Sequence, residues 1–471
     1  MDRIETDYVI VGAGAAGMAF ADTLLTETRA TIAMVDRRAE PGGHWNDAYP
    51  FVRLHGPSVL YGVESRALGS ERLAAHGINR GLLEQASGRE VLAYYHRLMR
   101  ERFLPSGRVR WLPATDWRGG IAVSRATGDE TPVVVRRKLV DAAFADTRLP
   151  LSEPPQFRVD EGVRLVPPHA LADLSRPAEG YVILGGGKTA MDCVVRLLEG
   201  GVPADRIVWV RPRDSWLLPR ENLQPAFGTF ERTMGALAGE LQAARDASSP
   251  DDLFRRLEAA GLMVRIDRSV TPTMYRCAIV SAPELAMLRR VEAVVRLGRV
   301  TALEPGRIVL ERGAVRSSPA WTYVNCTADG IPRRPPRPVF APGRITLQYV
   351  RRCQPCFSAA FVAHVEASQP DDAAKNALCR PVPPPDEPID WLRMHLEDAA
   401  NRRAWAASPD LQAWLAGSRL DRFTGLIARA AREPTPERLA ILARHREAAG
   451  PARANMAELM AKARGAVAEM A

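Results

Sequence analysis

The chain has 471 residues, of which 46% are hydrophobic and 25% are charged. This is the composition of a globular protein, and it excludes disordered and fibrous classes. No apolar run approaches the roughly 18–20 residues that a membrane helix needs. The N-terminus lacks a basic region followed by an apolar segment, so we expect neither a membrane protein nor a secreted one. Hydrophobic cores rarely exceed about 250–300 residues, which predicts two or three domains.

The formal net charge is +9, and nearly all of the positive charge comes from arginine, because lysine occurs at only four positions. The arginines are spread along the chain, which favours a solvated surface of mixed sign over a nucleic-acid interface. No helix-turn-helix, zinc-finger or RNA-recognition signature is present. Six cysteines in this length indicate no disulfide framework and fit a reducing cytoplasm.

The first half of the chain begins with a predicted βαβ unit. Residues 4–11 and 31–38 have the pattern of strands, and residues 18–27 have the apolar spacing of a helix. Residues 41–69 are rich in Gly, Pro and aromatic residues and predict an ordered loop, and residues 89–103 predict an amphipathic helix. Short strands follow, and a Pro-rich stretch at 148–180 indicates a crossover between domains.

A second predicted βαβ unit covers residues 181–213. Residues 221–262 have a mostly helical pattern, and residues 289–324 return to short strands. A Pro-rich linker at 381–388 precedes an Ala/Arg/Leu-rich helical region that runs to residue 471. The fold class that follows is α/β, with two Rossmann-like dinucleotide-binding domains and a C-terminal helical region.

The first strand-to-helix turn carries the motif Gly12-Ala13-Gly14-Ala15-Ala16-Gly17. Gly12 permits the tight turn, Gly14 lets the backbone approach a pyrophosphate, and Gly17 lets helix and strand pack closely. The helix N-terminus then offers free N–H groups to the phosphates. Asp36 lies 19 residues after Gly17, where a carboxylate can accept both hydroxyls of an adenosine ribose. The motif and its context indicate a dinucleotide site.

The second strand-to-helix turn is Gly185-Gly186-Gly187-Lys188-Thr189-Ala190, a GxGxxA motif. Its second strand ends in Arg211-Pro212-Arg213 instead of an acid. Arginine there offers a planar fork to a 2′-phosphate, which favours NADPH over NADH, although a pair of surface arginines is the alternative. With two such sites, we expect the first to hold FAD permanently and the second to bind NADPH reversibly, so that NADPH transfers a hydride to the flavin.

With these motifs the sequence resembles the two-dinucleotide-domain flavoproteins, and within them the class B flavin-dependent monooxygenases and N-hydroxylases. Gly42-Gly43-His44-Trp45 is similar to the flavin-loop motif of that family, and Cys326-Thr327-Ala328-Asp329-Gly330 resembles its late turn back to the FAD domain. The resemblance implies cofactor contacts at Gly12, Gly14, Ala15, Gly17, Asp36, Arg37, Gly43, His44, Trp45, Asp329 and Gly330 for FAD, and at Gly185, Gly187, Lys188, Thr189, Arg211 and Arg213 for NADPH.

The resemblance also implies an activity. NADPH reduces FAD, O2 gives a flavin C4a-(hydro)peroxide, and one oxygen passes to a small N- or S-containing, amino-acid-like substrate, without a metal.

The resemblance further implies how the chain is divided into domains. The FAD domain is expected at 1–165, the NADPH domain at 166–320 with a helical insertion around 221–300, the return to the FAD domain at 321–380, and the C-terminal region at 381–471. The class suggests a homo-oligomer.

Side chains beyond the cofactor motifs are weaker candidates. The flavin-loop residues His44, Asn46 and His55 are candidates for hydrogen bonds to the flavin or the nicotinamide, with an ordinary loop role as the alternative. Arg276, Arg351 and Gln354 are candidates for binding the substrate. The CxxC at Cys353 and Cys356 invites a disulfide-reductase or zinc interpretation, but it follows the late turn, so we expect two packed thiols.

Two other functions share some of these features. An NADPH-driven flavin reductase or dehydrogenase without a stable peroxide has the same cofactor motifs. A non-catalytic flavoprotein with a partner-binding helical C-terminus is disfavoured by the intact glycines and Arg211.

Overall fold

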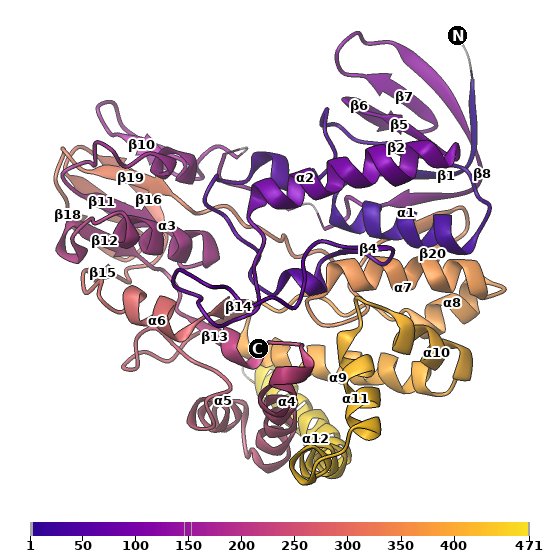
Figure 1. Ribbon diagram of the computed structural model, residues 1–471. Helices are drawn as coiled ribbons and strands as arrows, with labels where there is room; N and C mark the ends of the chain where they lie inside the picture. Colours follow the sequence, from indigo (N-terminus) through magenta and orange to yellow (C-terminus); the bar gives the residue numbers. More distant parts are fainter. Residues whose placement is uncertain (1–2, 146, 152, 470–471) are drawn as a thin grey trace.

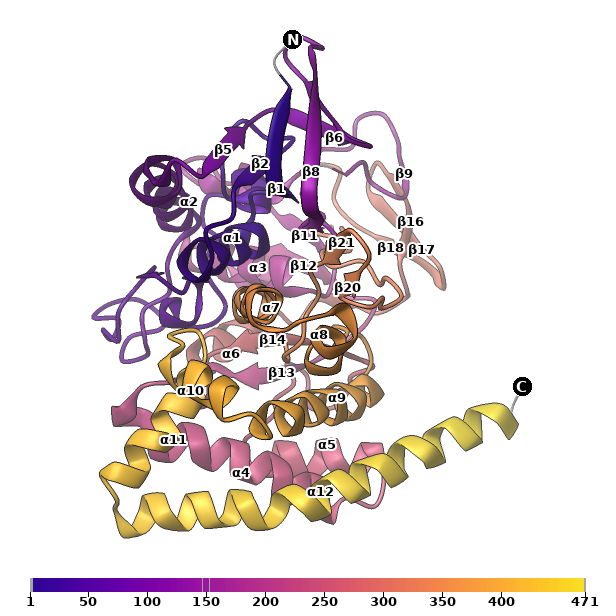
Figure 2. The ribbon, with the colours of Figure 1, turned by 90° about the vertical axis from the view of Figure 1, so that its right-hand side faces the viewer.

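The structure is a computed structural model that describes residues 3–145, 147–151 and 153–469. Two α/β bodies lie side by side above a layer of helices (Figure 1). In the perpendicular view, the long last helix, α12 (Pro436–Glu469), runs along the base of the molecule (Figure 2). This arrangement confirms the predicted fold class of two Rossmann-like units with a C-terminal helical region.

The first body contains the N-terminal βαβ unit. Its elements are β1 (Ile4–Val11), α1 (Ala15–Glu27), β2 (Ile32–Val35), α2 (Gly88–Leu98), β5 (Val109–Leu112), β6 (Thr115–Arg118), β7 (Ile121–Ser124), β8 (Glu130–Asp141), β20 (Phe340–Ala341), β21 (Arg344–Thr346) and α7 (Pro355–Ser368). The strand order is β20-β21-β8-β1-β2-β5, and β21, β8, β1, β2 and β5 run parallel. All four residues of β2 are buried, as expected for a parallel strand covered on both faces. α1 and α7 lie side by side on this sheet (Figures 1 and 2).

The second body repeats the same plan. Its elements are β9 (Arg158–Val159), β10 (Leu165–Val166), β11 (Tyr181–Leu184), α3 (Lys188–Glu199), β12 (Ile207–Val210), β15 (Val294–Val295), β16 (Val300–Glu304), β17 (Arg307–Leu310), β18 (Gly313–Arg316) and β19 (Thr322–Asn325). The parallel sheet has the order β10-β19-β11-β12-β15, and β9, β16, β17 and β18 form a separate sheet. β9 and β10 already belong to this body, and so does β19. The chain therefore enters this body before residue 166 and leaves it after Asn325. The domain boundaries given by the sequence stay a prediction.

The helical layer combines two segments that are far apart in the sequence. The insertion of the second body contributes β13 (Ser215–Pro219), α4 (Phe230–Asp246), α5 (Pro250–Ala259) and β14 (Met274–Val280). Its last helix, α6 (Ala282–Leu288), packs instead into the core of the second body. The C-terminal part contributes α8 (Asp372–Leu378), α9 (Pro388–Ala406), α10 (Pro409–Gly417), α11 (Arg422–Arg432) and α12. A shared core holds α4 and α5 to α9 and α12, and it includes Phe254, Trp391 and Met456. The C-terminal helices therefore close the molecule below the two bodies.

The loop predicted at 41–69 carries short turns of 3-10 helix and a small hairpin. The turns span Gly43–Asp47 and Ser58–Leu60, and the hairpin pairs β3 (Gly62–Val63) with β4 (Arg66–Ala67). Backbone bonds tie this loop to the first body, for example from the Gly42 N–H to the Ala13 oxygen at 2.8 Å. The loop thus lies across the first glycine turn.

Candidate active site

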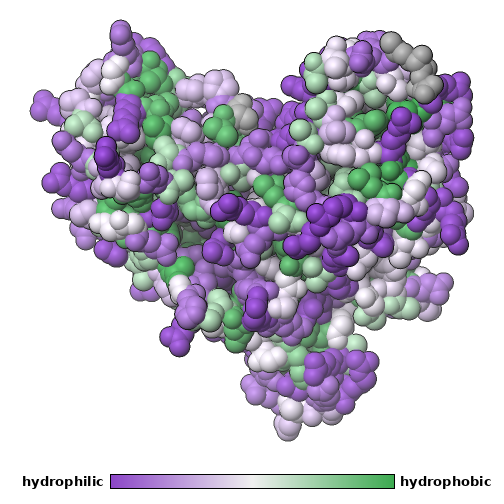
Figure 3. Space-filling view, turned by 45° about the horizontal axis from the view of Figure 1, so that its top comes forward, coloured by the Kyte–Doolittle hydropathy of each residue, from purple (hydrophilic) through white to green (hydrophobic). Residues whose placement is uncertain are grey.

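A cavity of about 1130 Å³ lies where the two bodies and the helical layer meet. Both glycine turns line it, through Gly12 and Gly14 of the first body and Gly186 and Gly187 of the second. The surface is hollowed between the two bodies (Figure 3). A cavity at the carboxyl ends of parallel strands is the usual place for a ligand in α/β proteins.

The first glycine turn has the close packing that its motif predicts. Gly12 has a φ of +110°, and a Cβ on Gly17 would lie 1.9 Å from the Gly12 carbonyl oxygen. The N–H of Ala13 donates to Asp36 Oδ2 at 2.6 Å, and the N–H of Arg38 donates to the other oxygen at 2.8 Å. Asp36 is buried and lines the cavity. Its carboxylate stabilises the turn through these two hydrogen bonds, and its oxygens have further lone pairs that can accept hydrogen bonds from a ligand. Ala15 and Arg37 line the same part of the cavity.

The flavin-loop motif covers this turn. Gly43 comes so close to Gly14 that a Cβ on Gly43 would lie 2.8 Å from the Gly14 Cα. The Trp45 indole N–H donates to the Tyr61 hydroxyl at 2.7 Å, so Trp45 both lines the cavity and joins the core. The Asn46 side chain instead donates to three backbone oxygens of its own loop, including that of Gly43 at 3.0 Å. Asn46 is thus engaged in holding the loop.

His44 and His55 both line the cavity. Burial, and then the nearby Arg38 guanidinium, lower the pKa of His44 to about 4. Burial, and then the Lys188 ammonium, lower the pKa of His55 to about 4. Both imidazoles are therefore neutral at pH 7, and each can make one hydrogen bond as donor and one as acceptor without adding positive charge.

The second glycine turn places Lys188 and Thr189 on the cavity wall. Gly185 has a φ of +126°, and a Cβ there would lie 2.7 Å from the Cys326 oxygen. The Lys188 ammonium forms an ion pair with Asp192, one turn along α3. Gly187 immediately precedes α3, and a Cβ on it would meet no described atom within 4 Å. The space in front of this helix is therefore open to the cavity.

Arg211 and Arg213 are both engaged by protein groups. Arg211 is buried, pairs with Asp214 at 3.1 Å and lies over the Trp209 ring at 4.8 Å. Its Nε and Nη1 atoms have no hydrogen-bond partner in the described part of the chain. Arg213 pairs with Asp386 at 2.9 Å. The role of these two arginines at a 2′-phosphate stays a prediction.

The late turn follows the end of β19 and lies between the bodies. Cys326, Ala328 and Gly330 line the cavity, whereas the Asp329 side chain pairs with Arg276 at 2.8 Å. Arg276 also pairs with the buried Asp386 at 2.5 Å. Arg276 therefore lines the cavity while paired with two carboxylates, of which Asp386 is shared with Arg213 and Arg333.

The far wall of the cavity is formed by the segment before α7 and by the helical layer. Arg351 is buried and pairs with Asp421 at 2.9 Å. Gln354 lines the cavity, and its buried Oε1 has no hydrogen-bond partner in the described residues. Of the three predicted substrate residues, Arg276 and Arg351 are paired with carboxylates, whereas the Gln354 oxygen has no partner in the described residues. Glu240 and His395 also line the cavity, and no motif in the sequence marks them.

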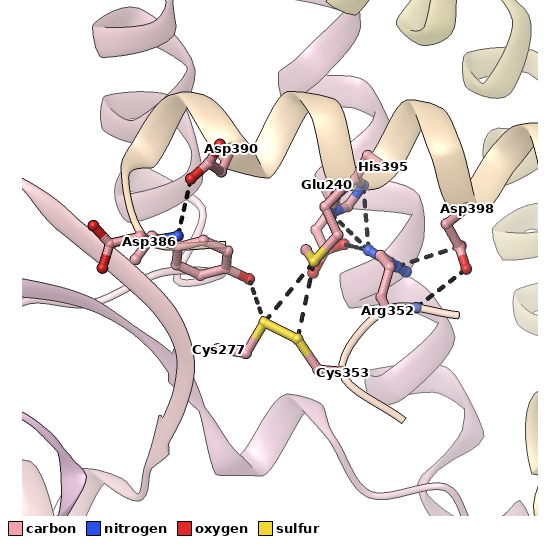
Figure 4. The surroundings of a disulfide bond; sticks show 10 residues. Glu240, Cys277, Arg352, Cys353, Asp386, Asp390, His395 and Asp398 are labelled. Carbon is pink, nitrogen blue, oxygen red and sulfur yellow. Dashed lines mark hydrogen bonds and ion pairs between the residues drawn. A yellow bond between two sulfur atoms is a disulfide. The ribbon is translucent and has the colours of Figure 1, made fainter. Parts of the chain in front are cut away.

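The cysteine expectation is wrong at Cys353. Cys353 forms a disulfide with Cys277 of β14, 76 residues away in the sequence, and both residues line the cavity (Figure 4). Cys356 is a free, buried thiol, so the CxxC is not a bonded pair. The spacing of 353 and 356 was uninformative because the partner comes from another body of the fold.

Comparisons with known proteins agree with the dinucleotide-binding prediction. Residues 10–66 match the NAD(P)-binding Rossmann-like domain family. The chain is 46% identical over 431 residues to the uncharacterized protein Rv2000 of Mycobacterium tuberculosis, covering 92% of this chain and 80% of that protein. The chain belongs to the family of this protein. A protein of Mycobacterium bovis, Mb2023, also uncharacterized, matches with the same identity and coverage.

Solved structures with a similar arrangement include two oxygenases. The polycyclic ketone monooxygenase of Thermothelomyces thermophila has a TM-score of 0.49 and 13% identity, over 97% of this chain and 85% of that one. The S-allyl-L-cysteine S-oxygenase of Allium sativum has a TM-score of 0.43 and 14% identity, over 95% and 99% of the two chains.

The residues around the cavity fit two dinucleotides. Three α-helices in the described chain begin with neither a side-chain cap nor an acidic residue in the first turn: α1, α3 and α7. All three begin at the cavity, at Ala15, Lys188 and Pro355. Uncapped helix N-termini present free N–H groups and a partial positive charge, which suit phosphates and other anionic groups.

Neither a membrane span nor a metal site is found in the described residues. None of their helices has both the length and the apolar character that crossing a membrane requires. No group of three or more His, Cys, Asp or Glu side chains among them is arranged to hold a metal ion.

Proposed function

We propose that this protein is an FAD-dependent, NADPH-consuming monooxygenase that transfers one oxygen atom from O2 to a small nucleophilic substrate containing nitrogen or sulfur. The overall balance is substrate, O2, NADPH and a proton giving oxygenated substrate, NADP⁺ and water. The single observation that carries the proposal is that α1, α3 and α7 all begin uncapped at one cavity. One cavity that accepts two dinucleotides is what hydride transfer between them requires.

The first body supplies the expected FAD site. Gly12, Gly14 and the N-terminus of α1 would hold the pyrophosphate, and the free side of the Asp36 carboxylate would accept the ribose hydroxyls. FAD, when bound, supplies two-electron transfer and the activation of O2. The start of α7 adds the partial positive charge of a third helix N-terminus to the cavity, although Pro355 at its first position has no N–H to donate.

The second body supplies the expected NADPH site. Gly187 leaves open space in front of α3, and Lys188 adds a positive charge at the same turn. The neutral imidazole of His55 lies beside Lys188 and can position a polar group without repelling a cation.

The protein also has to keep water away from the reacting groups. Trp45 and Tyr61 form part of the cavity wall, and their mutual hydrogen bond satisfies both polar atoms. A substrate would enter at the far wall, where the Gln354 side-chain oxygen is free to accept a hydrogen bond.

The test combines cofactor content with the fate of oxygen. The purified protein should carry FAD by absorbance and chromatography, and it should oxidise NADPH. A panel of amines and thioethers should then yield a product labelled by ¹⁸O2, in proportion to NADPH consumed. Absence of bound flavin after reconstitution would refute the proposal, and NADPH oxidation with no labelled product from any compound would favour the reductase instead.

A further inference from the structure

The Cys277–Cys353 disulfide connects two separate parts of the fold in one wall of the cavity. Cys277 lies in β14, within the insertion of the second body, and Cys353 lies in the segment that leads into α7 of the first body. Among the described residues this is the one disulfide, and the other four cysteines are free and buried. A cross-link between these parts constrains one wall of the cavity.

Both sulfur-bearing residues can be reached from the cavity. Cys353 is exposed and Cys277 is half-buried, and both belong to the cavity wall. A second pair of nearby cysteines provides a contrast: Cys193 and Cys326 have their sulfurs 3.7 Å apart, but both residues are buried. Thiol–disulfide exchange requires access of the attacking thiolate to a sulfur atom. Of these two pairs, Cys277–Cys353 is the one that forms a disulfide and that a thiol in the cavity can reach.

The backbone at both cysteines is in an unfavourable conformation. Cys277 has a φ of +53° and Cys353 a φ of +46°, and the third non-glycine residue with positive φ in the described chain is Ala114. The left-handed region is disfavoured for residues with a Cβ, and such residues concentrate at functional sites. Once the bond is open, each cysteine could leave its left-handed conformation independently of the other.

The surroundings suit the chemistry of exchange. The Tyr275 hydroxyl lies 3.7 Å from the Cys277 sulfur, and the Met394 sulfur of α9 contacts the Cys277 and Cys353 sulfurs at 4.0 and 3.9 Å. Burial raises the pKa of Tyr275, so its hydroxyl stays protonated and can donate a hydrogen bond. A thiolate leaving from Cys277 would therefore find a donor beside it.

We propose that Cys277–Cys353 is a thiol-exchange site that accepts a low-molecular-weight thiol from the cavity. The thiolate of that molecule attacks the Cys353 sulfur, the sulfur–sulfur bond breaks, and its electron pair leaves on Cys277, which takes up a proton. The product is a mixed disulfide on Cys353. A second thiol attacks the small-molecule sulfur, releasing the small disulfide and the Cys353 thiol. Two thiols are oxidised as one protein disulfide is reduced, and no cofactor takes part.

The closed and open states place different constraints on the cavity. In the closed state β14 is tied to the segment before α7, close to the predicted substrate residue Gln354. In the open state these two segments of the wall are joined by non-covalent contacts alone. The mixed disulfide would place a small organic group in the cavity itself. The concentration and oxidation state of small thiols would therefore control how other molecules enter the cavity.

The test counts thiols in the full-length protein after equilibration in its native state with oxidised or reduced glutathione. The samples are then denatured, alkylated and mapped by mass spectrometry. Oxidised glutathione should leave four alkylated cysteines and a linked Cys277–Cys353 peptide, and reduced glutathione should give all six. An identical count in the two buffers overturns the proposal, whether the bond stays closed or never forms.

Single variants test which sulfur is attacked. Cys277→Ser should trap one glutathione on Cys353 after treatment with oxidised glutathione, because the resolving thiol is gone. Cys353→Ser should react at least about tenfold more slowly, since Cys277 is less accessible. Cys193→Ser is the matched control and should leave the Cys277–Cys353 exchange unchanged. Failure of Cys277→Ser to gain an adduct, in a variant that melts like the parent, would contradict the proposal.

Tyr275→Phe provides a second test that leaves both cysteines in place. Opening by glutathione should slow several-fold while thermal stability changes little, because the lost group contacts the leaving sulfur. None of these measurements needs FAD, NADPH or O2. The thiol-exchange proposal can therefore be refuted without refuting the proposed oxygenation, and the oxygenation can be refuted without refuting the exchange.

Discussion

The Tyr49 hydroxyl donates a hydrogen bond to Asp192 Oδ2 at 2.6 Å and so joins the flavin loop of the first body to the first turns of α3 in the second. The other oxygen of Asp192 pairs with Lys188. The two predicted dinucleotide turns are thereby held in one geometry through a single carboxylate. The residues are 143 positions apart, and no motif connects them.

Tyr49→Phe tests this connection between the bodies. The substitution should lower the free energy of unfolding by about 1.5–3 kcal/mol, the range for hydrogen bonds to charged groups. Chemical denaturation of the parent, Tyr49→Phe, Asp192→Asn and the double variant would give the coupling energy between the two residues. Additive effects of the two substitutions would show that the contact does not contribute.

Gly187→Ala separates ligand binding from folding. No described atom lies within 4 Å of a Cβ at this position, so the protein should melt as the parent does. The added methyl group would occupy the space in front of α3, and the KM for NADPH should rise about tenfold or more, which corresponds to about 1.4 kcal/mol. An unchanged KM would place the nucleotide elsewhere.

Gly17→Ala is expected to act through packing. A Cβ there would lie 1.9 Å from the Gly12 oxygen, so α1 has to move away from β1. Overpacking of this kind costs about 1–3 kcal/mol, and the displaced turn should also lose FAD. Gly235→Ala in α4 is the control, because its Cβ would meet no described atom within 4 Å and alanine favours the helix. Melting temperature and flavin content after purification measure both effects.

Arg211→Gln tests the predicted preference for NADPH. If the two guanidinium nitrogens without a partner in the described chain receive the 2′-phosphate, the ratio of kcat/KM for NADPH over NADH should fall about tenfold. Asp214 keeps its second partner, Arg296 at 2.9 Å, so the carboxylate is not left unpaired. A loss of stability with an unchanged ratio would assign Arg211 a purely structural role.

His55 should make the folded state sensitive to acid. Its pKa falls from an ordinary value of 6.5 to about 4 on folding, so the unfolded chain binds the proton more readily. The stability contributed by the neutral imidazole is fully present above about pH 6.5 and is lost as the pH falls towards 4. His55→Gln should flatten the decline of melting temperature in this window, whereas the exposed His76→Gln should not. Parallel curves for parent and His55→Gln would contradict the assignment.

Local patterns were sufficient for the two βαβ units. Each glycine turn lies between an apolar strand and a helix in the printed sequence, and backbone sterics make the turn conformation a local property. The same holds for the amphipathic helix after residue 88 and for the helical character of the region beyond 388.

Patterns of the same kind misled where the partner was distant. Cys353 was grouped with Cys356 because they are three residues apart, yet its sulfur bonds to Cys277. The pattern around Arg213 also did not indicate its ion pair with Asp386 of the C-terminal linker, and its role at a 2′-phosphate stays a prediction. Side chains pair with whatever the tertiary structure brings near, and sequence spacing does not encode that.

The sequence by itself determined two dinucleotide-binding turns, their order and the elements around them, because each depends on a few consecutive residues and on the geometry of the backbone. Only the tertiary structure decided that three uncapped helices open on one cavity, that Tyr49 meets Asp192, and that a disulfide closes one wall. These relationships join segments of different bodies, and they are set by how the hydrophobic faces of sheets and helices pack, which is a property of the whole chain.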